Sequence, residues 1–493
     1  MFMVAQVGVD QLFLIVQQTA NNIIAKSLQL TANNSNSVHG STDFPLLEAP
    51  TGPPNTTADR LIDDQVYIRS AFRVSNSEIR LTVLQDHRNK RSIFYEYGSK
   101  TGQVSLLCNL PKCIDMFAPK CKIVGFIGQI FNLNEADNHP KLRLRFGQSK
   151  RVVELSIIDA RPKAKYEHNL GVCVQPIYMM SEYIVFIQFF EHWLARGATK
   201  FYMYRHSYSR EVQSILDFYT QHSGVSIEFI DWSDLPSRDS SYWPSKYLFR
   251  LEVMIAIFDC LHRARYNVKY IAQTDLDEIV VVKANNNSLF DFMESTLERN
   301  PKMSSVSLVS RRAKFQPSLE NISSPNELNL ELFNEVNTES YYFPRPVYSK
   351  LIHRPERVFK GHIHKQIGAE LLPNSKNFHG QYKLVEVPNT KAYILHLRRR
   401  LDRTFKRRLF TATNVLKEQA TEWQRNFANR LKKHTFPPRM QWNNGLDVLE
   451  KVDLCRKGHE ERRLRECHAV YDCVREVNTS DWFHAPNSWT HLY

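Results

Sequence analysis

The sequence lacks the short motifs that identify several common enzyme classes. No G-x-G-x-x-G follows a predicted strand, and no G-x-x-x-x-G-K-[ST] is present. These absences disfavour a dinucleotide-dependent dehydrogenase and a P-loop nucleotide hydrolase. Neither G-x-S-x-G nor H-E-x-x-H occurs, which disfavours the serine hydrolases and the zinc proteases that carry these motifs.

The chain also lacks a recognisable nucleic-acid-binding module. It has 493 residues and a formal net charge of +14, a balance that favours phosphate-bearing partners. However, no zinc-finger spacing, ribonucleoprotein motif or heptad array is present, and the basic residues are dispersed. The densest basic run extends from Arg398 to Arg408, and we interpret it as a solvated helix face. We therefore expect no nucleic-acid partner.

The eight cysteines contain no C-x-x-C pair and no Cys/His quartet with zinc spacing. Six of them form two local groups, Cys108/Cys113/Cys121 and Cys455/Cys467/Cys473. Such clustering predicts disulfides and an oxidising compartment, whereas reduced cysteines in a cytosolic protein are the alternative. Five Asn-x-Ser/Thr sequons favour the same compartment; they begin at Asn33, Asn55, Asn286, Asn321 and Asn478.

The N-terminus gives an ambiguous targeting signal. "MFMVAQVGVDQLFLIV" is mostly apolar, but it is short for a membrane span, contains Asp10 and has no basic flank. A degraded signal-anchor, a wrongly assigned start and an amphipathic helix all fit this pattern. Residues Gln29 to Asp59 that follow have the composition of a linker or stem.

The rest of the chain divides at about Gly171. Before this point, alternating patterns such as "EIRLTVLQ" and "KLRLRFG" predict a β-rich region. After it, predicted strands and helices alternate, which implies a mostly parallel, Rossmann-type α/β sheet flanked by helices. We predict four regions: an N-terminal targeting or anchor and stem-like segment (1–60), a β-rich accessory region (61–168), a catalytic domain (169–410) and a helical, cysteine-containing tail (411–493).

Several elements of the catalytic domain are predicted from helical spacing and caps. A first helix is expected between Ser181, as its N-cap, and Gly197. A longer helix is expected from about Ser245 to Arg265, and the strand "NVKYIAQTD" follows it.

An acidic cluster follows this predicted buried strand in "YIAQTDLDEIVVV" (270–282). If the strand continues, Asp275 and Asp277 point the same way, and Leu276 packs behind them. Two converging carboxylates need a cation between them, and Mn²⁺ or Mg²⁺ shared with a substrate diphosphate is the natural occupant. The alternative is a solvated turn, because one Asp-x-Asp is expected by chance in a chain of this length.

Several blocks of sequence, in order, resemble glycosyltransferase family 92. They are "FIQFFEHWLARGATKFYMYRHSYS", "FDCLHRARYNVKYIAQTDLDEIVVV", "YSKLIHRPERVFKGHIHKQIG" and "AYILHLRRR". The resemblance covers roughly Tyr67 to Arg408. It implies a GT-A-like fold, a metal-dependent, inverting transferase that uses a UDP-sugar, and a galactosyl product on a glycan or glycoprotein acceptor. It also implies residence in the Golgi lumen with type II membrane topology.

The resemblance also implies roles for particular residues. Asp275 would contact the nucleotide ribose and the metal, and Asp277 would ligate the metal. His396 would complete the metal shell, with His364 as the second candidate. Lys350 would face phosphate; an exposed lysine is the alternative.

Inverting transfer also needs a carboxylate base. The sequence does not select among Glu335, Glu339 and Asp291, so the catalytic base is left unassigned.

The sequence departs from the family pattern on the acceptor side. Ile279 stands where an aromatic residue usually follows the acidic cluster, and Leu397 replaces the tyrosine of His-Tyr-Arg. The stretch from Val306 to Phe315 lacks the expected aromatic and Gly/Ser-rich pattern. These differences favour the alternative function, a catalytically silent family member that binds glycans or partner proteins.

Overall fold

The computed structural model describes most of the chain after residue 64. The described residues are 65–492 except 90, 112, 114–120, 136, 238–242, 284–287, 315–321, 323, 376–379, 399–408, 437–441, 444, 462–466, 468–472 and 474–476. The predicted N-terminal segment therefore lies outside the described residues. Among those described, no helix is long and apolar enough to cross a membrane.

The first part of the described chain is rich in strands, as predicted. Its sheet has the order β4-β3-β7-β8-β1-β2-β6-β5, and the C-terminal strand β25 pairs with β1. The bounds are β1 Val66–Ser75, β2 Glu78–Asp86, β3 Ile93–Tyr97, β4 Lys100–Gln103, β5 Ser105–Cys108, β6 Ile123–Ile130, β7 Lys141–Phe146, β8 Val153–Asp159 and β25 Thr490–Leu492. We call this the accessory sheet.

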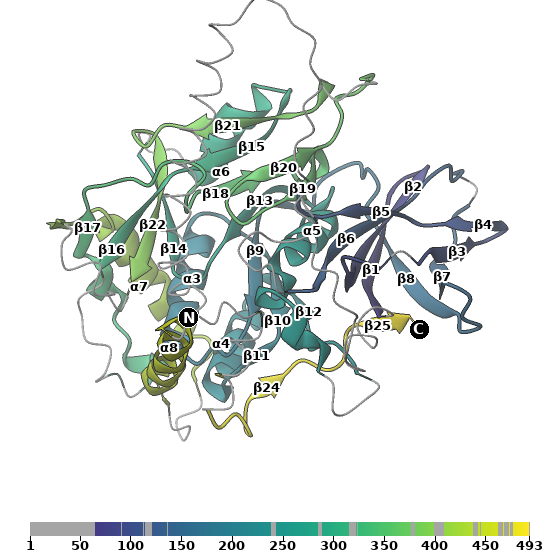
Figure 1. The fold of residues 1–493 in the computed structure, drawn as a ribbon. Coiled ribbons are helices and arrows are strands. Elements are labelled where there is room, and N and C mark those ends of the chain that lie inside the picture. Colours follow the sequence, from purple (N-terminus) through teal and green to yellow (C-terminus); the bar gives the residue numbers. More distant parts are fainter. Residues whose placement is uncertain are drawn as a thin grey trace, which may run out of the picture. The chain divides into compact units, whose positions relative to one another are not determined.

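A seven-stranded sheet forms the centre of the second part, with the order β12-β10-β9-β13-β18-β15-β21 (Figure 1). The strands from β12 to β13 are parallel, whereas β18 is antiparallel to both of its neighbours. The bounds are β9 His168–Ile177, β10 Lys200–Arg205, β12 Ser226–Asp231, β13 Val268–Thr274, β15 Met303–Leu308, β18 Lys350–His353 and β21 Lys383–Val387.

Helices cover both faces of this central sheet. Val172 and Val174 of β9 pack into the core that contains α3 (Tyr183–Ala195) and α4 (Arg210–Thr220). Cys173, between them, points to the other face and forms a disulfide with Cys260 of α5 (Val253–Ala264). Helix α5 also packs against β1, β2 and β6, so it lies between the central and accessory sheets (Figure 1). The α/β fold class predicted from the sequence is confirmed.

A five-stranded sheet, with the order β14-β22-β16-β17-β23, carries the late sequence blocks. The bounds are β14 Glu278–Val282, β16 Ser310–Lys314, β17 Val336–Glu339, β22 Ala392–Arg398 and β23 Phe410–Thr413. Two pairs are separate, β11 (Ser207–Tyr208) with β24 (Phe483–His484) and β19 (Val358–Gly361) with β20 (Gln366–Ala369). The remaining α-helices are α6 Leu289–Met293, α7 Lys417–Leu431 and α8 Leu446–Glu461.

The long helix predicted from Ser245 to Arg265 is wrong in its first half. Arg250, Leu251 and Glu252 have φ angles of 48°, 56° and 54°, so α5 begins only at Val253. Non-glycine residues adopt this left-handed conformation at a cost. Tertiary contacts hold the segment: Trp232 Nε1 donates to the Leu251 carbonyl, 2.8 Å away. Helical spacing alone does not reveal such contacts.

The predicted N-cap of the first helix is also not observed. Helix α3 begins at Tyr183, and the Ser181 hydroxyl instead donates a hydrogen bond to the carbonyl of Gly445, at 3.1 Å. The predicted stop fits the structure, because Gly197 follows the helix end with φ of 89°. A glycine adopts this angle without steric cost.

All eight cysteines are paired, which confirms the predicted disulfides. Two bridges lie within the local groups, Cys108–Cys113 and Cys455–Cys473. Cys121–Cys467 joins the two groups across 346 residues of sequence. Of the sequons, only Asn478 is described, and it is exposed.

Candidate functional site

The predicted acidic cluster lies in a turn, not in an extended strand. β13 ends at Thr274 and β14 begins at Glu278, so Asp275, Leu276 and Asp277 connect two strands. The two-residue alternation expected for Asp275 and Asp277 therefore does not apply. Leu276 does pack against the core. The turn follows the carboxyl end of a central parallel strand, where ligands bind in sheets of this type.

Neighbouring strands hold Asp275 on both of its carboxylate oxygens. Lys350, the first residue of β18, places Nζ 2.8 Å from Oδ2. Gln175 of β9 donates from Nε2 to Oδ1. Since β9 and β18 are the two strands that flank β13, the sheet itself orients this carboxylate.

Lys350 also joins Asp275 to the third acid of the cluster. Its side chain is 2% exposed, and Nζ lies 3.2 Å from Oε2 of Glu278. The same Oε2 accepts from the Asp275 backbone N–H at 3.1 Å. A buried lysine between two carboxylates is therefore observed, and the alternative of an exposed lysine is wrong.

Burial raises the pKa of Glu278 to about 8, against the opposing effect of Lys350 and with help from Asp275 and Asp277. Burial is the largest cause of this rise, and the negative charges of Asp275 and Asp277 are smaller ones. A further cation beside the cluster would offset those negative charges.

Asp277 faces His396, as the resemblance implies. Nε2 of His396 lies 3.4 Å from Oδ2 of Asp277. His396 is directly opposite Glu278 in the antiparallel pair formed by β14 and β22. The turn and the late strand are therefore brought together by the register of the five-stranded sheet.

The protonation states of this pair suit metal binding. Burial lowers the pKa of His396 to about 4, with a further lowering by Arg398, so the imidazole is neutral at pH 7. Burial would raise the pKa of Asp277, but His396 and Arg398 oppose it, and the net pKa is below the ordinary value. An ionised carboxylate and a neutral imidazole are the forms that bind divalent ions.

One further observation tests whether the residues fit a metal ion. Oδ1 of Asp277 is buried and has no hydrogen-bond partner among the described residues. A buried carboxylate oxygen without a partner is costly, and a cation would satisfy it. The described residues contain no cluster of three or more His, Cys, Asp or Glu in metal-binding geometry. Asp277 and His396 thus fit an ion whose remaining ligands are water and substrate oxygens.

His364, the second histidine candidate, is held elsewhere. Its Nδ1 lies 3.0 Å from the carbonyl oxygen of Ser349. The ring of Tyr348 lies 6.0 Å from the His364 ring and 6.5 Å from the His396 ring. The structure therefore places His396, and not His364, against Asp277. The binding role of each predicted residue stays a prediction.

The three candidate bases occupy different environments. Asp291 accepts hydrogen bonds from Ser288 and caps the short helix α6. Glu335 is exposed. Glu339 is 2% exposed and ends β17, in the same five-stranded sheet as His396.

The register places Glu339 in a row with His396. Arg312 of β16 is opposite His396, and the antiparallel register of Ala313 with Thr338 puts Glu339 opposite Arg312. Residues in one row point to one face of a sheet. Two strand spacings, about 10 Å, separate His396 from Glu339.

Sequence reasoning missed Gln175 and gave Glu278 no role. Gln175 lies in the block "VCVQPIY", but a glutamine 100 positions before Asp275 carries no local signal. Glu278 was visible as the third acid. Its partner Lys350 comes from a strand whose register the sequence does not reveal.

Comparison with known proteins identifies the family pattern in this part of the chain. The model of glycosyltransferase family 92 matches residues 168–451, which is more than half of the chain. No curated protein matches the sequence.

Solved structures give only weak global similarity. One is a mannosyltransferase from Pyrobaculum calidifontis in complex with GDP-Man and Mn²⁺: 9% identity, 64% of this chain and 88% of that chain covered, TM-score 0.24. Another is TarS 1-349 from S. aureus in complex with UDP-GlcNAc: 13% identity, 63% and 82% covered, TM-score 0.25. A third is HddC from Yersinia pseudotuberculosis: 12% identity, 46% and 93% covered, TM-score 0.22.

Proposed function

Because the chain belongs to glycosyltransferase family 92, we propose that it transfers galactose from a UDP-sugar to a glycan or glycoprotein acceptor, with inversion at the anomeric carbon. The observation that carries this proposal is the pair formed by Asp277 and His396, with the partnerless Oδ1 of Asp277 beside it. Asp277 lies in the turn after β13, where a nucleotide-sugar would bind, and His396 reaches it from β22.

The chemistry of the transfer gives the residues separate tasks. The acceptor oxygen forms a bond to the anomeric carbon while the bond from that carbon to the diphosphate breaks, and the bonding electron pair leaves with UDP. A bound Mn²⁺ or Mg²⁺ stabilises the negative charge of the leaving diphosphate. Asp277 and His396 would hold this ion, and Lys350 with Gln175 would orient Asp275 toward the nucleotide.

The acceptor hydroxyl must lose its proton to a carboxylate. Among the three candidates, the geometry supports Glu339, since it shares a sheet row with His396. About two strand spacings separate His396 from this carboxylate, and Arg312 lies between them in the row.

The disulfides support a place of action in the secretory pathway. Four bridges among the described residues require an oxidising compartment to form and persist. An oxidising lumen is consistent with the Golgi, which the family resemblance implies; we propose that location, with membrane association through the N-terminal segment as part of the same proposal.

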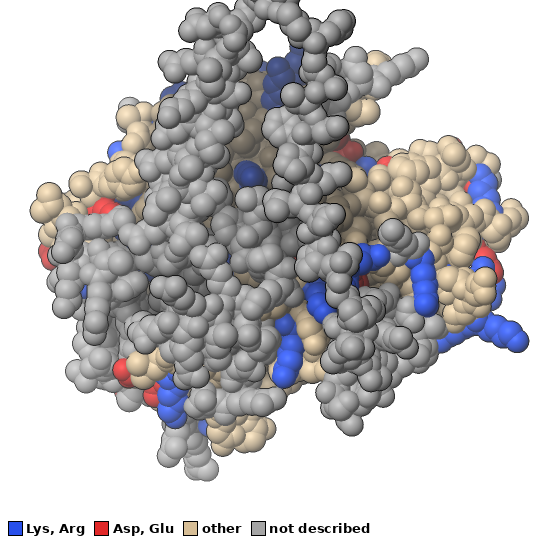
Figure 2. Space-filling model, in the orientation of Figure 1, with Lys and Arg blue, Asp and Glu red and all other residues tan. Residues whose placement is uncertain are grey.

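The positive net charge gives little support for a nucleic-acid partner, which would need one contiguous basic surface. On the face shown in Figure 2, the Lys and Arg side chains of the described residues lie in separate small groups.

Titration calorimetry with UDP, with and without Mn²⁺, tests the proposed function. Wild-type protein is expected to bind UDP much more tightly when Mn²⁺ is present. Asp277→Asn should lose this metal dependence, because the amide oxygen is a weaker ligand than the carboxylate. Asp159→Asn serves as a matched control, since Asp159 is an exposed carboxylate of the accessory sheet that pairs with Arg161, and it should bind like the wild type.

A wild-type protein that binds no UDP with either Mn²⁺ or Mg²⁺ would contradict the enzyme proposal. That result would favour the catalytically silent module. Metal-dependent UDP binding that survives in Asp277→Asn would instead show that the metal is held elsewhere.

A further inference from the structure

Arg398 lies beside the metal pair, at the end of β22. His396 and Arg398 are two residues apart on one strand, so both side chains project from the same face. The intervening Leu397 donates its backbone N–H to the carbonyl of Asp277 at 2.9 Å, which fixes the end of β22 against the acidic turn. The guanidinium charge is close enough to lower the pKa of both Asp277 and His396, although burial is the larger influence on each.

The side chain of Arg398 is buried without a counter-ion. It is 5% exposed, and neither Nε nor Nη2 has a hydrogen-bond partner among the described residues. The described part of the chain also offers no carboxylate within ion-pairing distance of it, Asp277 included. A buried arginine charge of this kind is unfavourable unless an anion neutralises it.

Two other largely buried arginines are paired with carboxylates. Arg263 of α5 lies 2.6 Å from Asp259, and Arg80 lies 2.8 Å from Glu78. Arg73, which is 2% exposed, has no carboxylate partner in the described part of the chain, but four backbone carbonyls accept hydrogen bonds from its guanidinium group. Arg398 differs from them in its environment, not in its residue type.

The unsatisfied atoms at this site are complementary. Oδ1 of Asp277 lacks a cation, and Nε and Nη2 of Arg398 lack an anion. A single ligand that satisfies both must carry a divalent cation and an oxyanion together. A metal-bound diphosphate has this composition, and the planar guanidinium group binds phosphate oxygens through two parallel hydrogen bonds.

We propose that Arg398 binds the diphosphate of the nucleotide-sugar directly and stabilises it as the leaving group. This inference rests on the proposed function. It adds a second positive group at the site, supplied by the chain itself. Lys350 is already engaged by Asp275 and Glu278, whereas Arg398 has no carboxylate partner among the described residues and could therefore bind phosphate.

The test compares Arg398→Met with Arg398→Lys and with a matched control, Arg311→Met. Arg311 lies on β16, pairs with Leu395 and points to the opposite face, where its Nη2 donates to the hydroxyl of Tyr393 at 3.0 Å. Calorimetry in the presence of Mn²⁺ would measure the affinity for UDP and for uridine, which has no phosphate.

Arg398→Met is expected to weaken UDP binding about 10- to 100-fold, the usual effect of charge-assisted hydrogen bonds. Uridine binding should not change, and Arg398→Lys should recover part of the UDP affinity. Arg311→Met should bind UDP like the wild type. Equal UDP affinity in the wild type and Arg398→Met would overturn the inference.

Thermal unfolding without ligand separates this role from a structural one. Removing a buried, unpaired charge should leave the melting temperature of Arg398→Met unchanged or raise it, whereas the shift produced by UDP with Mn²⁺ should shrink. A clear fall in the ligand-free melting temperature would assign Arg398 to folding instead. If the wild type itself binds no UDP, the proposed function fails and the inference about Arg398 fails with it. Wild-type binding that Arg398→Met preserves removes only the inference.

Discussion

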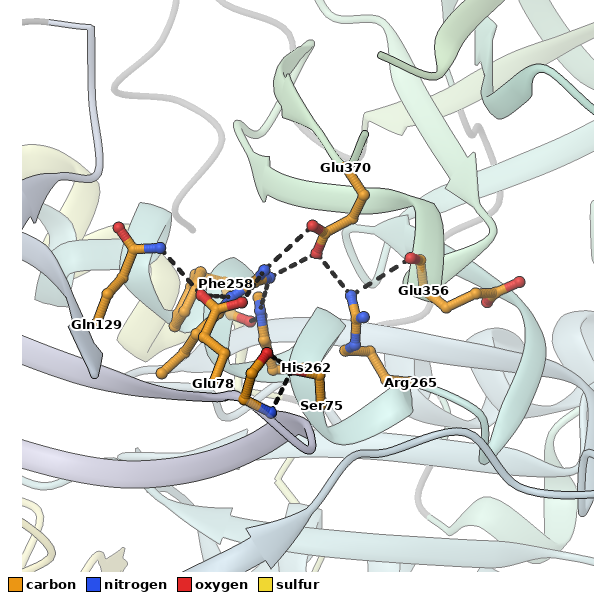
Figure 3. A network of polar contacts seen from close by, with 10 residues as sticks. Ser75, Glu78, Gln129, Phe258, His262, Arg265, Glu356 and Glu370 are labelled. Atoms are coloured by element: carbon orange, nitrogen blue, oxygen red, sulfur yellow. Dashed lines mark hydrogen bonds and ion pairs between the residues drawn. The ribbon is translucent and has the colours of Figure 1, made fainter. Parts of the chain in front are cut away.

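Two buried clusters of charged side chains in this protein differ in how completely their charges are paired. The first joins the accessory sheet to α5 and to the segment after β20 (Figure 3). In it, Arg80 of β2 lies 2.8 Å from Glu78 and 2.5 Å from Glu370, and Arg265 lies 2.8 Å from the same Glu370. His262 completes the cluster: its Nε2 is 3.1 Å from Arg80 Nη1, and its Nδ1 is 2.8 Å from the carbonyl oxygen of Phe258.

The second cluster lies at the turn after β13 and is incomplete. Asp277 and Arg398 are both in it, yet each has buried polar atoms without a hydrogen-bond partner among the described residues. Every charged side chain in the first cluster has an oppositely charged neighbour, although Nε of Arg265 is likewise buried without a hydrogen-bond partner in the described part of the chain. The comparison indicates that the first cluster serves to hold two sheets together, and that the second is shaped for a ligand that supplies the missing charges.

The first cluster also connects the accessory sheet to the rest of the described chain. Arg80, Glu78 and Gln129 come from that sheet, while Glu370 and Arg265 come from the catalytic part of the chain. Removing one partner of these buried pairs would leave an uncompensated charge at the contact between the two sheets. The accessory sheet is therefore an integral part of the folded protein.

The largest predicted effect comes from opening the complete cluster. Glu370→Gln leaves Arg265 without a carboxylate partner and leaves Arg80 with only one, Glu78. We expect a loss of about 3–5 kcal/mol in the free energy of unfolding, the usual cost of breaking a buried ion pair. Urea denaturation would measure it. The exposed pair of Lys141 and Glu154, 2.9 Å apart, provides the control, and Glu154→Gln should cause no measurable change. Equal effects of both substitutions would contradict the distinction.

The second-largest predicted effect concerns Glu191, a buried carboxylate whose contribution to the free energy of unfolding should depend on pH. Burial raises the pKa of Glu191 from 4.5 to about 7, although Arg430 and the hydroxyl of Tyr219 oppose this rise. Between these values the unfolded chain releases a proton that the folded protein retains. Stability linked to Glu191 is thus present below pH 4.5 and is lost as the pH rises through about 7.

Glu191→Gln should flatten this part of the stability profile, by up to about 3 kcal/mol between pH 4.5 and 8. Denaturation of the wild type and the variant at several pH values would measure the difference. A constant difference at all pH values would mean that the pKa of Glu191 is not raised.

The smallest predicted effect concerns the contact between β6 and the left-handed segment before α5. Gly125 donates its N–H to Oε1 of Glu252 at 3.0 Å. A Cβ at Gly125 would lie 2.7 Å from that oxygen and 2.9 Å from Cβ of Ile255. Gly125→Ala should therefore destabilise the protein by about 1–3 kcal/mol through overpacking.

A double-mutant cycle with Glu252→Ala sharpens this prediction. The two substitutions should be less than additive in urea denaturation, because Glu252→Ala removes the oxygen against which the added methyl group would press. Strict additivity would show that the alanine methyl group acts on Ile255 alone. The left-handed segment would then need another explanation.

Much of the fold follows from patterns that are local in the sequence. Alternating residues such as those of "EIRLTVLQ" predict β2, and the apolar run ending at Thr274 predicts β13 with its acids at the carboxyl end. Ordered blocks predict the family, and cysteine clustering predicts disulfides. These features depend on residue types and short spacings, which the sequence displays directly.

Tertiary structure alone decided which of these residues meet. Three contacts depend on bringing together segments that are far apart in sequence. They are the contact of Asp277 with His396 and not His364, the position of Lys350 between Asp275 and Glu278, and the Cys121–Cys467 bridge. The break at Arg250–Glu252 and the missing partners of Arg398 likewise depend on what packs around them. Burial and pairing depend on the residues that surround a side chain in the fold. An arginine at position 80 therefore forms structural ion pairs, whereas an arginine at position 398 is a predicted ligand contact.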